Sequence, residues 1–294
     1  MNFNDLLKSR SIAPEQVIVL RHRPNEPALN KILPWLAAER HDLFNAYQQA
    51  QFGRVERAME SLIGKGHVAS FIGVNPRTAL FIGLDKVAGA KPLNREQFWD
   101  VPANAELKAF GMKGFTEEES RNSVLWFDLV LTDFYDAWKG KLVVGWPPPE
   151  LAWMRRAHKN DFPIQAVFEE SVLDAVMPAW DAIDVTWEEL RILPTKWKSA
   201  LQHWRGIYYI FDTSDGKGYV GSASGAGNIL DRWLGYAATG HGGNKLLKQR
   251  NPANFRFSIL QRLSPDLEAA QVIQVESSWK LRLHSRAPFG LNDN

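Results

Sequence analysis

The stretch RGIYYIFDTSDGKGYVGSA, residues 205–223, decides the fold of the C-terminal part of this chain. Two short apolar runs that contain tyrosine, GIYYIF and GYVGSA, flank the polar segment DTSDGK, which is the pattern of a β-hairpin. Tyr208 and Tyr209 are adjacent and therefore point to opposite faces of a strand. Tyr219 lies across the turn, where a hairpin brings it near Tyr208. Packing alone explains tyrosines on a hairpin, so the pattern leaves a structural and a chemical role open.

The residues after the hairpin predict a small α/β unit. GSASGAGNILDRWLGYA, residues 221–237, begins as a Gly-rich loop and continues as a helix on which Arg232 and Tyr236 share a face. This loop lacks the Gly-Lys-Ser/Thr ending of a phosphate-binding loop, which argues against a nucleotide site. NFRFSILQRL, residues 254–263, alternates like a strand.

A second helix is predicted over residues 264–285, with Ser264 as its N-cap and Pro265 at its first position. Glu276 falls inside the apolar stripe of this helix. A carboxylate there is costly unless it is paired or binds a cation. The alternatives are therefore a metal ligand, an ion pair with Arg232, or a side chain that reaches solvent at the edge of the stripe.

Charge is distributed unevenly along the 294 residues. Residues 194–294 carry 13 Lys and Arg against 7 Asp and Glu, a net charge of +6, whereas residues 1–193 carry 22 against 26, a net charge of −4. A basic C-terminal third suits a polyanionic partner such as nucleic acid, although it also aids solubility. Cysteine is absent, which excludes disulfides, thiolate metal sites and a Cys nucleophile.

The N-terminal part combines helical patterns over residues 25–63 with strand-like runs at 17–22, 67–74, 78–89, 123–135 and 141–146. We expect the later runs to form an antiparallel, barrel-like sheet. Three prolines in WPPPELAW, residues 146–153, prevent a central strand from continuing there. No membrane-spanning run and no signal-peptide layout are found, so a cytoplasmic protein is expected.

The ordered set of Gly206-Ile207-Tyr208, Tyr219-Val220-Gly221, Arg232, Tyr236, Glu276 and Asn292 resembles the GIY-YIG nuclease family. The second motif reads YVG in place of YIG, which leaves its Tyr and Gly in position. The resemblance covers residues 205–294, and the first two-thirds of the chain lies outside it. The resemblance implies a nuclease domain over residues 205–294. Together with the change of charge and the element patterns, it predicts an α+β protein with a mixed N-terminal domain over residues 1–194 and a linker over 195–204.

The resemblance implies hydrolysis of phosphodiester bonds with one divalent cation, Mg²⁺ or Mn²⁺. Glu276 would be the metal ligand, and Tyr208 would act as general base or orient the attacking water. Tyr219 would bond near the scissile phosphate, and Arg232 would stabilise its developing charge. Tyr236 occupies the position four after the arginine, where the family places Tyr or His. Asn292 would fix the loop that closes the site.

Other residues are candidates for contacts with DNA outside the catalytic set. His241 lies in a Gly-rich loop, and three basic residues would extend a phosphate-binding face: Lys245, Lys248 and Arg250. In the N-terminal part, Trp146 opens the Pro-rich corner ahead of Arg155 and Arg156. It is a candidate for stacking on a flipped base, and the alternative is a core tryptophan at a strand end.

These features predict a DNA endonuclease of the restriction or genome-defence kind, whose N-terminal domain selects a sequence or a modified base. The alternatives are a non-catalytic nucleic-acid-binding protein and a repair or mobile-element nuclease. One active site cuts one strand, so a double-strand break requires a homodimer on DNA or two successive nicks. No membrane partner is expected.

Overall fold

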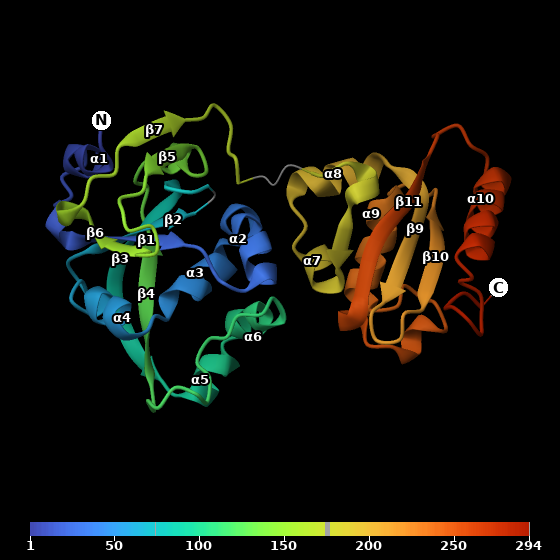
Figure 1. Ribbon diagram of the computed structural model, residues 1–294, viewed down its shortest axis with the longest axis horizontal. Helices are drawn as coiled ribbons and strands as arrows, with labels where there is room; N and C mark the ends of the chain where they lie inside the picture. The colour runs from blue at the N-terminus through green and yellow to red at the C-terminus, as the bar shows by residue number, and fades with distance from the viewer. Residues whose placement is uncertain (74, 174–176, 294) are drawn as a thin grey trace. The chain divides into compact units, whose positions relative to one another are not determined.

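The computed structural model describes residues 1–73, 75–173 and 177–293. The chain divides into two compact units, Met1–Asp174 and Ala175–Asn294 (Figure 1). Both units combine helices and strands, so the chain is of the α+β class. Within the described residues, none of the helices has the length and apolar character that crossing a bilayer requires.

The first unit is built on a curled sheet with strand order β6-β1-β2-β3-β5-β7, and β4 also pairs with β3. Strands β1 and β2 pair in parallel, and the other pairs are antiparallel. The antiparallel sheet that the sequence predicts therefore carries one parallel pair, because α2, α3 and α4 form the crossover from β1 to β2. The strands are β1 (Val17–His22), β2 (His67–Ile72), β3 (Thr78–Leu93), β4 (Val124–Leu131), β5 (Leu142–Gly145), β6 (Met154–Arg156) and β7 (Ile164–Val167).

Strand β1 is buried along its whole length because both faces of the sheet are covered. Val17 and Val19 pack on one face with Phe3 of α1, and Ile18 packs on the other with Val55 of α4. Double coverage explains the continuous apolar run at the start of the strand. The helices are α1 (Phe3–Ser9), α2 (Pro27–Glu39), α3 (His41–Gln49), α4 (Gly53–Glu60), α5 (Arg95–Asp100) and α6 (Pro102–Ala109), with 3-10 turns η1 (Pro14–Gln16), η2 (Asp136–Trp138) and η3 (Ala157–Lys159).

A buried polar network lies in the first unit around Gln48 of α3. Gln48 Oε1 accepts from Ser70 Oγ at 2.6 Å and lies 3.2 Å from His22 Nε2, while Gln48 Nε2 donates to Asp85 Oδ2 at 3.1 Å. Burial lowers the pKa of His22 to about 4 and raises the pKa of Asp85 to about 6. The network therefore holds an imidazole that stays neutral and a carboxylate that is costly to ionise.

The second unit is an antiparallel sheet with strand order β10-β9-β11-β8. Ile207 and Val220 pack with Val272 of α10 on one face, whereas Trp233 of α9 packs against Phe257 on the other. The strands are β8 (Asp184–Thr186), β9 (Arg205–Asp212), β10 (Gly218–Ala223) and β11 (Phe255–Leu263), and the helices are α7 (Trp187–Arg191), α8 (Thr195–His203), α9 (Asn228–Thr239) and α10 (Ala269–Arg282), with 3-10 turns η4 (Trp180–Ala182), η5 (Leu247–Gln249) and η6 (Pro252–Asn254).

Two boundaries differ from the sequence-based expectations. Residues 195–203, expected as part of a linker, form α8, and β8 ahead of it pairs with β11 through Thr186 and Arg256. The second unit therefore includes described residues before 194. The final helix begins at Ala269, with Glu268 as N-cap, so the prediction of Ser264 as N-cap is wrong. Ser264 Oγ instead accepts from the backbone N–H of Asp266, in a turn that precedes the helix.

Candidate active site

The predicted hairpin is present as β9 and β10, and its register decides which tyrosines meet. Tyr208 pairs with Gly221, so Tyr208 and Tyr219 lie on one face, while Tyr209 pairs with Val220 and packs on the other. Gly221 lets the Tyr208 ring lie against β10, since a Cβ at position 221 would clash with Tyr208 Cζ. The Gly of the second motif is thus required for the position of the Tyr of the first.

Tyr208, Tyr219 and Tyr236 form a cluster that we call the tyrosine cluster. The Tyr208 and Tyr236 hydroxyl oxygens are 3.0 Å apart, and the ring centroids of the three pairs lie 6.0 to 6.5 Å apart. Asn244 Nδ2 donates to the Tyr236 hydroxyl at 2.8 Å. Helix α9 contributes Tyr236 to the face of the sheet that carries the other two rings.

Burial raises the pKa of all three phenols above its ordinary value. The positive charge of Arg232 lowers the pKa of Tyr208 and Tyr219, but by less than burial raises it. Arg232 itself is exposed on α9, and none of the described residues forms an ion pair with it. The protein alone therefore presents neutral phenols, which donate hydrogen bonds, beside a free guanidinium.

Glu276 approaches the same strands from α10, on the opposite face of the sheet. Its Oε1 forms an ion pair with Lys280 Nζ at 2.8 Å, and its Oε2 accepts a hydrogen bond from Ser222 Oγ of β10. The Glu276 side chain is 17% exposed and that of Lys280 is 7% exposed. The alternative of an ion pair with Arg232 is wrong, because α9 and α10 lie on opposite faces and the next turn of α10 supplies the cation.

A cavity of about 350 Å³ brings parts of both faces together beside β10. Tyr219 and Glu276 both line it, so the tyrosine cluster and the carboxylate share one space. The described residues contain no group of three or more His, Asp and Glu side chains arranged to hold a metal ion. Other residues lining this cavity are Asn244, Lys245, Lys280 and Asp293.

Asn292 is buried, and its side chain bonds both backbone groups of Val220 in β10. Its Oδ1 accepts from the Val220 N–H at 2.9 Å, and its Nδ2 donates to the Val220 C=O at 2.8 Å. The N–H of Leu291 also donates to the Gly218 C=O at 2.9 Å. Because β10 is the edge strand of the sheet, these bonds complete a backbone that no further strand covers.

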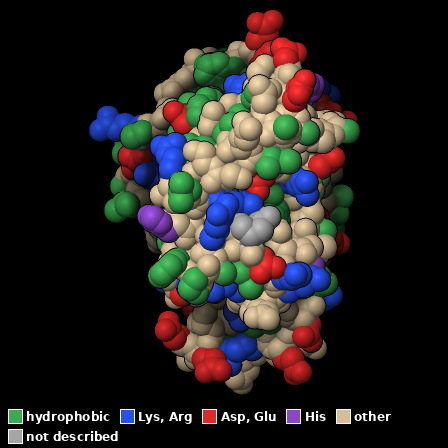
Figure 2. All heavy atoms as spheres, turned by 90° about the vertical axis from the view of Figure 1, so that its right-hand side faces the viewer, with side chains coloured by type: hydrophobic (Ala, Val, Ile, Leu, Met, Phe, Trp, Pro, Cys, Tyr) green, Lys and Arg blue, Asp and Glu red, His purple; other side chains and the backbone are tan. Residues whose placement is uncertain are grey.

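The predicted phosphate-binding residues are only partly available. Lys245 is exposed and pairs with Asp293 at 3.1 Å, and Lys248 is exposed on η5. His241 Nδ1 accepts from the Gly243 N–H at 2.9 Å within its loop. On the α10 side of the second unit, Lys and Arg side chains gather among acidic and hydrophobic ones, and do not form a uniformly basic face (Figure 2).

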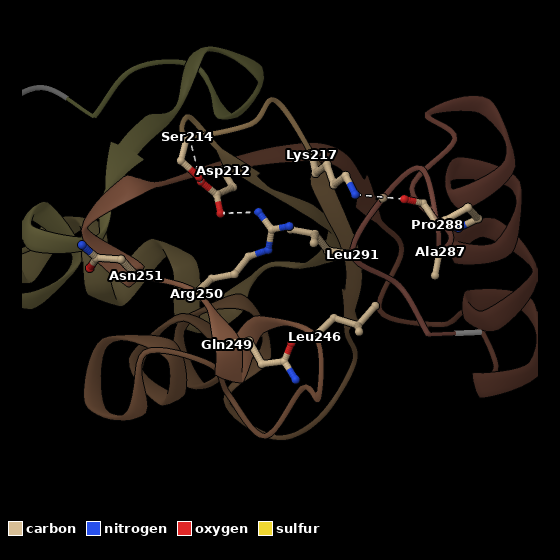
Figure 3. A pocket seen from close by; sticks show the side chains of 11 residues that line it. Asp212, Ser214, Lys217, Leu246, Gln249, Arg250, Asn251, Ala287, Pro288 and Leu291 are labelled. Carbon is tan, nitrogen blue, oxygen red and sulfur yellow. Dashed lines mark hydrogen bonds and ion pairs between the residues drawn. The ribbon is translucent and has the colours of Figure 1, made fainter.

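Arg250 belongs to a separate cavity of about 520 Å³. Its guanidinium pairs with Asp212 at 2.7 Å, and Lys217 Nζ donates to the Pro288 C=O at 3.0 Å (Figure 3). The Arg250 guanidinium also pairs with Asp215 at 2.8 Å. Two carboxylates thus neutralise Arg250. This pairing argues against its expected contribution to a phosphate-binding face.

The candidates in the first unit lie around the Pro-rich corner. Trp146 is buried, packs against Phe162 and donates its Nε1–H to the Ala152 C=O at 3.1 Å. Arg155 Nη2 donates to two proline carbonyls of the corner, and Arg156 is exposed at the end of β6. A buried indole offers no face to a base, so Trp146 takes the alternative role of a core tryptophan.

Sequence reasoning missed Ser222, Asn244 and Lys280. Lys280 lies four residues after Glu276, and this spacing on a helix is the signal that would have found it. Ser222 follows the YVG motif directly and bonds Glu276 across the sheet edge. Nothing in the local pattern of TGHGGNK indicates that Asn244 reaches the tyrosine cluster.

No known protein-family model matches the chain, and no curated protein matches it. Among solved structures, the chain is similar to the catalytic domain of the homing endonuclease I-TevI, at 28% sequence identity. The match covers 31% of this chain and 98% of that domain, with a TM-score of 0.26.

Proposed function

We propose that the second unit hydrolyses phosphodiester bonds in DNA with a divalent cation held at Glu276. The observation that carries this proposal is convergence at the β10 edge. Residues separated by up to 84 positions, from Tyr208 to Asn292, meet on this strand or line the cavity beside it. A set of phenols, an unpaired arginine and a half-buried carboxylate is more than packing requires.

The residues present fit a single hydrated cation. Glu276 lines the cavity, and its oxygens retain lone pairs for a metal beside the bonds to Ser222 and Lys280. Mg²⁺ binds through one or two carboxylates and keeps several waters, so a full cage of protein ligands is not required. A bound cation polarises phosphodiester oxygens and stabilises the charge that develops on them.

The remaining residues position the phosphodiester and the attacking water. Arg232 is free to pair with the phosphate and to stabilise its developing charge. Tyr208 and Tyr219 are neutral at ordinary pH, so we assign them hydrogen bonds to the water and the phosphate. General-base action by Tyr208 needs a field beyond that of Arg232, because burial outweighs the arginine in setting the phenol pKa.

We further propose that the first unit selects the DNA and that the whole chain acts in restriction or genome defence. A first unit of nearly balanced charge, with 21 Lys and Arg against 22 Asp and Glu over residues 1–174, that carries a local group of arginines is consistent with that division of labour. A non-catalytic binding protein is the second candidate. The presence of every residue in the set argues against it, since a site that has lost its activity is free to lose residues.

The test is a cleavage screen with the full chain. Unmodified, methylated, hydroxymethylated and glucosylated plasmid DNA are incubated with Mg²⁺ or Mn²⁺, and nicked and linear products are separated on gels. We expect cleavage by the wild type, and a loss of about 100-fold or more for Arg232→Ala and Glu276→Gln. Asp266→Asn, an exposed carboxylate in the turn before α10, is the matched control and should cut normally.

Absence of cleavage on all four substrates with either metal contradicts the enzymatic proposal. Circular dichroism and thermal melting of each variant exclude unfolding as the cause of a loss. Equal cleavage by wild type and Glu276→Gln removes Glu276 from the metal site. Equal cutting of all four substrates contradicts selection of a modified base.

A further inference from the structure

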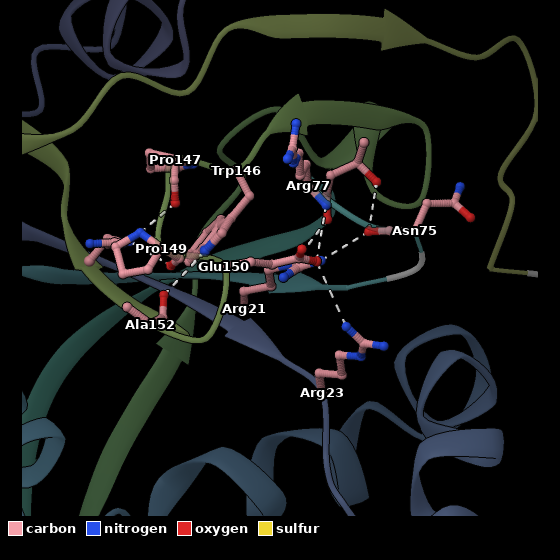
Figure 4. Close-up of polar contacts among 11 residues, drawn as sticks. Arg21, Arg23, Asn75, Arg77, Trp146, Pro147, Pro149, Glu150 and Ala152 are labelled. Carbon is pink, nitrogen blue, oxygen red and sulfur yellow. Dashed lines mark hydrogen bonds and ion pairs between the residues drawn. The ribbon is translucent and has the colours of Figure 1, made fainter.

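The segment between β5 and β6, residues 146–153, forms a Pro-rich corner whose polar contacts are drawn in Figure 4, and we call it the proline corner. Its apolar side chains include two that reach solvent. Leu151 is 94% exposed and Trp153 is 38% exposed. Leu151 is the most exposed large hydrophobic residue among the described part of the chain. An apolar side chain held this far into solvent has no role in the core of the first unit.

Buried contacts brace the corner from beneath. Arg21 is 3% exposed in its side chain, and its Nη2 pairs with Glu150 Oε1 at 3.2 Å. The same guanidinium donates to the Thr78 C=O at 3.0 Å and the Asn75 C=O at 2.9 Å. Glu150 Oε1 also accepts from the Arg77 N–H at 3.1 Å, so the β2–β3 turn and the corner are joined through one carboxylate (Figure 4).

The corner is also tied from within. Trp146 Nε1 donates to the Ala152 C=O, and Arg155 Nη2 donates to the Pro147 C=O at 3.1 Å and the Pro149 C=O at 2.8 Å. Three consecutive prolines fix their own φ angles, which lowers the entropy that the loop loses on binding. The tip that carries Leu151 is therefore held in one shape before any partner arrives.

Four arginines lie at the proline corner. The guanidinium groups of Arg21 and Arg23 pair with Glu150, and the side chain of Arg23 is 59% exposed. Arg77 contacts Glu150 through its backbone N–H, and Arg155 bonds proline carbonyls of the corner. Arg77 is exposed as well. Residues 1–174 as a whole are nearly balanced, with 21 Lys and Arg against 22 Asp and Glu, so four arginines beside one carboxylate are a local surplus of positive charge that favours an anionic partner.

We propose that the proline corner is the element by which the first unit engages duplex DNA, with Leu151 as a wedge at a base step of the minor groove and Arg23 and Arg77 on the flanking phosphates. A protruding apolar side chain between exposed cations is the chemistry of minor-groove proteins that unstack and kink a duplex. This inference rests on the proposed function for its choice of partner. It replaces Trp146, whose ring is buried, by Leu151 as the residue that meets the bases.

The test separates binding from cutting. Full-length Glu276→Gln protein is titrated into a fluorescein-labelled duplex, with anisotropy as the readout, at several salt concentrations. A second duplex carries 2-aminopurine, whose fluorescence rises when its base step is unstacked. Leu151→Ser and the double variant Arg23→Gln/Arg77→Gln are made in the same background, with Leu281→Ser and Arg54→Gln as exposed controls elsewhere.

We expect Leu151→Ser to weaken binding about 10-fold and to abolish the 2-aminopurine signal. The double arginine variant should lower the slope of log K against log salt by about 2, because two phosphate contacts are lost. Both controls should bind as the parent does. Thermal melting of each variant checks that the corner substitutions leave the fold intact.

The proposal is overturned if Leu151→Ser and Leu281→Ser bind alike, or if the parent binds no duplex. It is also overturned if an acidic polypeptide binds at the corner while the duplex does not, which would make the partner a protein. If duplex binding depends on the corner but the wild-type protein cuts no DNA, the proposed nuclease activity is contradicted and this inference stands. If the wild-type protein cuts DNA but the corner variants bind as the parent does, the nuclease proposal stands and this inference is contradicted.

Discussion

Asn292 provides a direct test of how the C-terminal segment supports the site. Substitution by Ala removes two hydrogen bonds, of 2.9 and 2.8 Å, that join this side chain to the N–H and C=O of Val220. Both Val220 groups are buried and face outward from the edge strand, so no other strand replaces the lost partner. We expect the segment after α10 to detach from β10 in this variant.

The magnitude follows from two buried backbone groups left without partners. Each hydrogen bond contributes about 1 kcal/mol net, and each unsatisfied buried group costs about 1 to 3 kcal/mol. Water entering the detached edge relieves part of that cost, so the expected local destabilisation is about 2 to 4 kcal/mol. This corresponds to an opening equilibrium that is larger by roughly 30-fold to 1,000-fold, at 1.4 kcal/mol for each factor of ten.

Hydrogen exchange measured by mass spectrometry reports this opening at the segment concerned. Peptides that cover residues 218–223 and 285–293 should exchange faster by that factor, while peptides from β9 and β11 should change little. Asn251→Ala, which removes an exposed cap of η6, is the matched control. Unchanged protection of residues 218–223 in Asn292→Ala would refute the assignment of this side chain as the clamp on β10.

Three further outcomes are expected. Lys280→Met, which frees the Glu276 carboxylate of its internal cation, should tighten Mn²⁺ binding about tenfold in electron paramagnetic resonance titrations; unchanged affinity contradicts this. Because burial raises the pKa values of the three phenols, the stability held by the tyrosine cluster is complete below pH ~10 and is lost as the pH rises further; the part of the 295 nm absorbance that these three phenols contribute should therefore rise together with unfolding, and a rise before unfolding contradicts this. Asp85→Asn removes a carboxylate whose pKa of about 6 makes ionisation costly, so the variant should be more stable at pH 7 by about 3 kcal/mol. Between pH 6 and 4 the unfolded state protonates His22 while the folded state keeps it neutral, and Asp85 no longer offsets this difference. The variant should therefore lose stability more steeply than the wild type over that range, as measured by hydrogen exchange in β1 to β3.

The hairpin could be predicted because its information is local. Two apolar runs around a turn specify β9 and β10, and alternation alone places Tyr208 and Tyr219 on one face and Tyr209 on the other. The role of Gly221 could not be predicted in the same way. It depends on the register of the two strands, which brings that glycine directly opposite the Tyr208 ring.

The surroundings of Glu276 show where sequence reasoning ends. The position of this carboxylate in an apolar stripe predicts that it needs a partner, and the structure supplies Lys280 and Ser222. Choosing between Lys280 and Arg232 requires knowing that α9 and α10 cover opposite faces of the sheet. That arrangement arises from packing between distant segments and leaves no local pattern.

The same limit explains Trp146 and the start of the second unit. The Pro-rich corner could be recognised from its prolines, but the burial of Trp146 results from Phe162 and Arg21, which lie far away in the sequence. Strand β8 has three residues, too few for alternation to be visible, and only its pairing with β11 identifies it. Both features depend on contacts between distant segments that exist only in the folded chain.

The net charge of the cavity depends on whether the ion pair between Glu276 and Lys280 is intact. While the pair is intact the two charges cancel, so this pair does not itself attract a polyanion to the cavity. Under the proposed function, a divalent cation at Glu276 would add two positive charges at one step, so cation and nucleic acid would each raise the affinity for the other. By thermodynamic reciprocity, the concentration of free cation would then set how tightly DNA is held, and Lys280 would set the cation concentration at which that response begins.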